Sequence, residues 1–154
     1  MHPVIYRSAS ACGAVACLVG AVGACLFDAR DARADDAKSL TTAMKCERAT
    51  EPGRVKCSIE AHVSGGRSIA WADVALVELP DFTAALKGRI GPSDATSREA
   101  ASQRWAFGLV ARKTGEGEAR ARVRALVCEP KAGAASAPKC QPVVVDVKAL
   151  VHVG

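Results

Sequence analysis

Hydrophobic and polar residues alternate along much of this chain. Between Arg54 and Val63 every second residue is apolar, and the residues between them are charged or polar. This period of two is typical of a β-strand with one face buried and the other in water. We therefore expect a half-buried strand over residues 54–63.

The same period returns in the C-terminal third of the chain. Apolar residues alternate with polar or small ones over 105–111, 119–127 and 143–153. Thr114-Gly115-Glu116-Gly117 lies between the first two segments and has the composition of a hairpin turn. The pattern predicts three more strands, the first two of them joined as a hairpin.

The middle of the chain is less regular. Residues 69–79 form a more evenly apolar strand that ends at Pro80. Residues 81–90 fit either a short capped helix or another strand, and residues 91–102 read as a loop. Strands with one solvent-exposed face imply antiparallel sheets, and two such sheets must pack their apolar faces against each other. We predict an all-β, antiparallel β-sandwich.

The N-terminus has the pattern of an export signal. Arg7 is followed by an uncharged stretch over residues 8–27, and Ala32-Arg33-Ala34 supplies small residues for a signal peptidase. This pattern divides the chain into three parts. We expect a signal peptide over 1–34, a polar lead-in over 35–45 and the sandwich domain over 46–154.

Two alternatives to cleavage after Ala34 stay open. Val22-Gly23-Ala24-Cys25 resembles a bacterial lipobox, in which Cys25 would carry a lipid. The apolar stretch is also about long enough to cross a bilayer as an uncleaved anchor, roughly 20 residues at helical rise. All three interpretations place the rest of the chain outside the cytoplasm, in the periplasm or the extracellular space. Contact with a membrane is expected only through such an anchor or lipid.

Composition limits the remaining part to one modest domain. The chain has 154 residues, of which 120 follow Ala34, and this is the usual size of a single domain. The formal net charge falls from +5 to +4 without the first 34 residues, because they hold three arginines and two aspartates. A mild charge favours no particular partner. Few aromatics and many alanines imply a core of small side chains, which benefits from covalent support.

The cysteines supply that support. Of the seven, four follow the targeting segment: Cys46, Cys57, Cys128 and Cys140. An even count in an exported domain predicts two disulfides. Turn-forming residues lie between Cys46 and Cys57 and again between Cys128 and Cys140, which favours pairing within each of these couples.

A rival pairing joins Cys57 to Cys128, because the order Cys57, Trp71, Cys128 resembles that of immunoglobulin domains. The alternation argues against it, since Cys57 falls among apolar positions and Cys128 among arginines. A zinc site is not expected, because neither couple has the close spacing of zinc ligands. We expect no metal and no cofactor.

Residues 123–153 carry a further resemblance. A strand that ends in Cys128, then Cys140 and Pro142, then an alternating valine strand resembles part of the immunoglobulin-like amino-terminal domain of the bacterial periplasmic thiol:disulfide interchange protein. The resemblance implies an immunoglobulin-like sandwich. It also implies that Cys128 and Cys140 form a redox pair that exchanges electrons with partner proteins.

Little else in the sequence points to catalysis. His62 and His152 fall on the polar side of predicted strands, and no nucleophile motif or metal-protease motif occurs. Arg120, Arg122 and Arg124 form a stripe that either binds an anionic surface or is the solvated face of a sheet. Nucleic-acid binding is not expected, because the chain is exported and lacks interleaved aromatics.

These observations favour an exported, non-catalytic module with a binding or structural role in the cell envelope. Its partner is either an envelope protein or an anionic surface. The alternative function is thiol-disulfide exchange through Cys128 and Cys140. An enzyme of another class is the least favoured interpretation.

Overall fold

The protein is built almost entirely of β-strands. The computed structural model describes residues 40–130 and 137–154. The strands are β1 (Thr41–Cys46), β2 (Gly53–His62), β3 (Ser68–Glu78), β4 (Thr83–Ala85), β5 (Arg89–Ile90), β6 (Ala95–Arg98), β7 (Ser102–Ala111), β8 (Gly115–Cys128) and β9 (Cys140–Val153). One short 3-10 helix, η1 (Pro92–Asp94), precedes β6. The described part of the chain contains no helix long and apolar enough to span a membrane.

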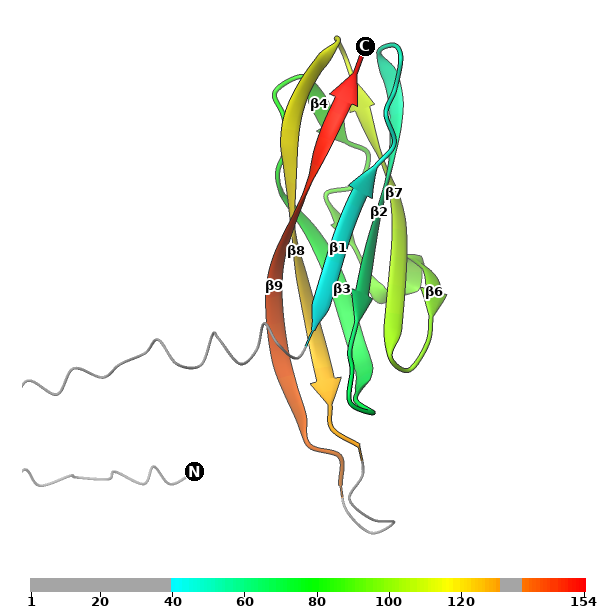
Figure 1. The fold of residues 1–154 in the computed structure, drawn as a ribbon, viewed down its shortest axis with the longest axis vertical. Coiled ribbons are helices and arrows are strands. Elements are labelled where there is room, and N and C mark those ends of the chain that lie inside the picture. Colours follow the sequence, from blue (N-terminus) through cyan, green and yellow to red (C-terminus); the bar gives the residue numbers. More distant parts are fainter. Residues whose placement is uncertain (1–39, 131–136) are drawn as a thin grey trace, which may run out of the picture.

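The strands form two antiparallel sheets, which confirms the predicted sandwich (Figure 1). In the first, sheet A, the order is β1-β2-β7-β4, and β6 also pairs with β7. In the second, sheet B, the order is β5-β3-β8-β9. Antiparallel pairing lets each sheet bury one face and leave the other in water, as the alternating sequence requires.

The core lies between the sheets and consists mainly of small and β-branched side chains. Trp105 of β7 is its largest fully buried member. Many of the other buried positions are alanine or valine, among them Ala61, Ala72, Ala119, Ala121, Val55, Val74 and Val123. Each buries less apolar surface than a leucine or an aromatic residue, and burial contributes about 25 cal/mol per Å².

The two sheets are tied together at one end of the sandwich. The Ala49 N–H donates to the carbonyl of His152 (3.1 Å), and the Gly154 N–H donates to the carbonyl of Ala49 (2.9 Å). In Figure 1 the C-terminal end of β9 accordingly lies beside the connection between β1 and β2. This contact joins the edge strand of sheet B to sheet A.

The expected lead-in over residues 35–45 extends too far. Its last five residues belong to β1, which pairs with β2 from Thr41 opposite His62 to Cys46 opposite Cys57. Leu40 and Met44 are buried in the core. The inward positions of β1 include a threonine, which weakened the apolar alternation on which the prediction depended.

Residues 81–102 also differ from expectation. They hold β4, β5, η1 and β6, so the helix considered for 81–90 does not form and the loop expected over 91–102 is partly a strand. These strands have two to four residues each and alternate between the two sheets. Segments this short cannot show a clear period of two.

The expected hairpin between the strands at 105–111 and 119–127 does not form. β7 belongs to sheet A, whereas β8 pairs with β3 and β9 in sheet B. Thr114 therefore lies in a connection between the sheets. Alternation identifies a half-buried strand, but both sheets present the same pattern, so it does not say which sheet the strand joins.

The two tryptophans of the chain occupy opposite environments, which makes them a test of the fold. Trp105 is fully buried, whereas Trp71 is 40% exposed on the outer face of sheet B. In Trp71→Phe the tryptophan fluorescence comes from buried Trp105, and we expect its emission to be blue-shifted and weakly quenched by iodide. In Trp105→Phe the fluorescence comes from exposed Trp71, and we expect its emission to be red-shifted and strongly quenched by iodide. The reverse result would mean that the two sheets are packed through the wrong faces.

Candidate functional site

Both disulfides predicted from the sequence are present, in the local pairing. Cys46 of β1 bonds to Cys57 of β2, and Cys128 of β8 bonds to Cys140 of β9. In each case the two cysteines lie directly opposite one another on adjacent antiparallel strands. The rival pairing of Cys57 with Cys128 is wrong, because these cysteines lie in different sheets and on different faces.

The two disulfides differ in their access to solvent. Cys57 is part of the core, and Cys46 packs against it. Cys128 and Cys140 instead lie on the outer face of sheet B, at the even-numbered positions of β8 and β9 that also hold the arginines. Cys140 is exposed, but Cys128 is buried, at 6%. Cys140 therefore gives the second disulfide the greater access to a partner, although Cys46 and Cys57 also border a shallow surface hollow.

The arginine stripe lies on this same outer face, and each arginine is paired with a carboxylate. Arg120 Nε donates to Glu118 (2.9 Å), and Arg122 Nε donates to Asp146 (2.7 Å). These hydrogen bonds raise the pKa of both guanidinium groups. An anion that bound here would have to compete with the carboxylates of the protein itself.

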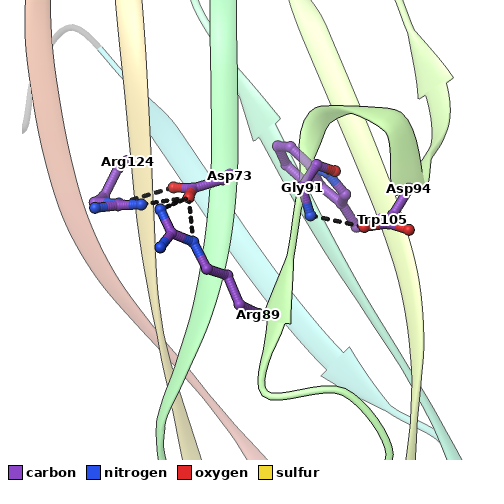
Figure 2. A network of polar contacts seen from close by, with 6 residues as sticks. All are labelled: Asp73, Arg89, Gly91, Asp94, Trp105 and Arg124. Atoms are coloured by element: carbon purple, nitrogen blue, oxygen red, sulfur yellow. Dashed lines mark hydrogen bonds and ion pairs between the residues drawn. The ribbon is translucent and has the colours of Figure 1, made fainter.

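The third arginine of the stripe meets a buried carboxylate. Asp73 of β3 is only 1% exposed, yet it lies on the outer side of sheet B, opposite Arg124. Arg124 Nε donates to Asp73 Oδ1 at 2.8 Å, and its Nη2 bonds to Oδ2. Arg89 of β5 donates to Oδ2 from the other side, at 2.9 Å from Nε. Figure 2 shows the two guanidinium groups converging on this carboxylate.

The segment that carries Arg89 is bonded to sheet A as well. The indole Nε1 of buried Trp105 donates to the carbonyl of Gly91 (3.3 Å), and the Gly91 N–H donates to Asp94 Oδ2 (2.8 Å; Figure 2). Lys87 Nζ also donates to the Asp94 carboxylate. The hydrogen bond from Lys87, and to a smaller extent the one from Gly91, lowers the pKa of the Asp94 carboxyl. Residues 89–94 thus link Asp73 in sheet B to Trp105 in sheet A.

An apolar hollow adjoins this charged network. Its lining includes the side chains of Trp71, Leu126, Pro142 and Val144, and its volume is about 360 Å³. We refer to it as the Trp71 hollow. Trp71 is 40% exposed and Val144 55% exposed. The Arg124 guanidinium carbon lies 5.9 Å from the centre of the Trp71 ring, so this cation contacts both Asp73 and the hollow.

Sequence reasoning missed Asp73 and the exposure of Trp71. Asp73 lies in the strand that read as evenly apolar, and its partners are 16 and 51 residues away along the chain. A carboxylate inside an apolar strand is itself a signal, since a buried charge requires a counter-ion. The identity of that counter-ion follows only from the register between β3 and β8.

The described residues contain no cluster of side chains that could hold a metal ion. They hold no set of three histidine, cysteine or acidic side chains placed to bind a metal ion. His62 is exposed, and His152 Nδ1 lies 2.9 Å from Glu116. Cys25, the candidate lipid attachment site, lies outside the described residues.

Comparison with known proteins does not identify a family. No protein-family description matches the sequence, and no curated protein matches it either. Among solved structures the chain is similar to the crystal structure of BslA, a bacterial hydrophobin, with a TM-score of 0.31 and 8% sequence identity. The match covers 74% of this chain and 94% of that one. A likeness at this level carries no argument about function.

The Asp73 network predicts a strongly non-additive effect of its two arginines on stability. With Arg89→Gln or Arg124→Gln alone, the carboxylate keeps one counter-ion, so we expect a small change in the free energy of unfolding. With both substitutions, Asp73 is left buried without a counter-ion, which costs about 3–5 kcal/mol. Urea unfolding of the four proteins measures this coupling.

A fifth protein controls for the loss of the arginine side chains themselves. Adding Asp73→Asn to the double variant removes the buried charge, and we expect most of the lost stability to return. Additive single effects, or no recovery with Asp73→Asn, would show that the network contributes through packing and not through the charge of Asp73.

Proposed function

We propose that this protein is an exported, non-catalytic module that binds a partner protein through the Trp71 hollow. The observation that carries the proposal is the exposed Trp71 among apolar neighbours, on a sheet face where the nearby charges are paired with one another. Exposed apolar surface with a polar rim is typical of interaction sites. Tryptophan is also prominent among the residues that dominate binding energy.

The position of the hollow favours a polypeptide as the partner. It reaches β9, the edge strand of sheet B. The Glu129 N–H donates to the carbonyl of Lys139. In an antiparallel pair of strands, hydrogen-bonded and non-hydrogen-bonded residue pairs alternate. The even-numbered residues of β9 therefore direct their peptide groups away from β8. Val144 therefore presents its peptide groups at the open edge, beside the hollow. An extended segment could bond to this edge and place an apolar side chain against Trp71.

Two features support a location outside the cytoplasm. The disulfides indicate an oxidising environment. The first 34 residues have the pattern of a signal peptide, with Cys25 as an alternative site of lipid attachment. The immunoglobulin-like character implied by the sequence resemblance belongs to this proposal as well.

Site-specific photo-cross-linking in the producing cells tests the binding proposal. Val144 and Leu150 lie on the same face of β9 and have nearly equal exposure, 55% and 58%, but only Val144 lines the hollow. We expect a photoreactive side chain at position 144 to give a discrete adduct of higher mass, and the same side chain at 150 to give none. The adduct should disappear when Trp71→Ser is added. Equal adducts at both positions, or an adduct that survives Trp71→Ser, would contradict the proposal.

A second candidate function is thiol-disulfide exchange, favoured by the position of Cys128–Cys140. This disulfide lies on the outer face of sheet B, two residue pairs beyond Leu126 and Pro142 of the hollow. A thiolate of a partner dithiol would attack the exposed Cys140 sulfur and release Cys128 as a thiolate. The second partner thiol would then resolve the mixed disulfide. The partner would leave oxidised, and Cys128 and Cys140 would both be reduced.

Equilibration in glutathione buffers separates the two functions. For a purely structural Cys128–Cys140 bond, which the first proposal requires, we expect a reduction potential below about −300 mV. An exchange partner would show a value between about −270 and −120 mV, the range of dithiol oxidoreductases. Cys46–Cys57 serves as an internal reference in the same peptide maps, because its sulfurs belong to the core side of sheet A.

A further inference from the structure

The outer face of sheet A carries positive charges that are not paired. Lys45 of β1 and Arg54 and Lys56 of β2 are all exposed. Among the residues that the structure describes, no carboxylate lies within ion-pair distance of any of the three. The arginines of the stripe on sheet B, in contrast, all have such partners.

The strand register brings these three cations together. Arg54 and Lys56 are two residues apart on one strand, a distance of about 7 Å. Lys45 lies opposite Ser58, the next outward position after Lys56. Two shallow hollows of about 250 and 220 Å³ run along this face, and both are lined by Lys56 and Ala106. We call the surface formed by Lys45, Arg54 and Lys56 the Lys56 face.

The surface between the charges consists of small residues. Lys56 lies opposite Gly108, and Ser58 lies opposite Ala106. A side chain at Gly108 would meet Leu86 Cδ1 at 2.9 Å and Arg54 Nε at 3.1 Å. The absence of a side chain at Gly108 therefore lets Leu86 and Arg54 lie across the strand. Leu86, which is 55% exposed, adds an apolar side chain to this charged face.

Acidic groups offset only part of this charge. Glu47 lines one of the two hollows, together with Lys45 and Lys56. Glu51 lines a further hollow with Glu47, and Arg48, Arg54 and Lys56 line it as well. Glu60, further along β2, is paired with Arg104 at 3.1 Å. The Lys56 face thus keeps an excess of positive charge in the folded protein.

We propose that the Lys56 face docks on an anionic phospholipid surface. Its hollows are shallow and open along the sheet, so a single small anion would stay largely in water, whereas a surface of many phosphates can engage all three cations at once. Leu86 can enter the headgroup layer beside them. β1, which carries Lys45, is also the first strand of the described residues, and only 13 residues separate it in the sequence from the apolar stretch at residues 8–27.

This proposal goes beyond protein binding at the Trp71 hollow and is compatible with it. The Lys56 face and the Trp71 hollow lie on the outer faces of different sheets, and therefore on opposite sides of the sandwich. A protein docked through sheet A would present Trp71 away from the membrane, toward its partner.

Vesicle sedimentation at low salt tests the proposal with the protein as purified from its envelope. We expect binding to vesicles that contain anionic phosphatidylglycerol to exceed binding to pure phosphatidylcholine at least about tenfold, since each cation near such a surface contributes about a factor of five. The neutral vesicles measure any binding by the N-terminal segment. The preference should disappear in Lys45→Gln/Arg54→Gln/Lys56→Gln and at high salt.

A matched control removes the same charge elsewhere. Arg67, Arg98 and Lys139 lie outside the Lys56 face. Changing all three to glutamine should keep the preference, and so should Val144→Asp in the Trp71 hollow. An equal loss in this control would mean that net charge alone drives binding, and would overturn the proposal. Binding to soluble dextran sulfate without binding to anionic vesicles would also overturn it, and would assign the face to a polyanion.

Discussion

The outer face of sheet B is organised by one carboxylate that is withdrawn from water. Burial of an ionised carboxyl group is costly unless counter-ions and hydrogen bonds replace its hydration. Asp73 receives them from Arg124 of β8 on one side and Arg89 of β5 on the other. The register of β3 against β8 and the position of β5 are therefore both coupled to Asp73. The same interaction holds Arg124 near the Trp71 ring, at one side of the apolar hollow.

This use of charge gives the two sheets different surfaces. In sheet B the arginines of the stripe are paired within the sheet, so what remains for a partner is the apolar surface around Trp71. In sheet A, Lys45, Arg54 and Lys56 have no counter-ion among the described residues, so what remains there is positive charge. Binding depends on the groups that the fold leaves unpaired, and these groups are different in kind on the two sides of the molecule.

The sequence predicted those parts of the fold that depend on one strand at a time. β2, β7, β8 and β9 are long, and each has one face toward the opposite sheet, so their alternation was clear. The local disulfides followed from the phase of Cys57 and Cys128 and from the turns between the cysteines. Sheet membership could not be predicted, because a half-buried strand has the same pattern in either sheet. The short strands between residues 83 and 98 owe their structure to their neighbours and not to a pattern of their own.

The candidate surfaces show why function was harder to predict than fold. The stripe at Arg120, Arg122 and Arg124 was visible because its members alternate on one strand, and Arg54 and Lys56 alternate in the same way on another. What separates the two sets is the residue across the sheet: Asp73 and Asp146 lie opposite Arg124 and Arg122, whereas Gly108 lies opposite Lys56. An exposed charge becomes available to a ligand only when its neighbours in three dimensions leave it unpaired. That property depends on strand order and register, which no single segment of the sequence contains.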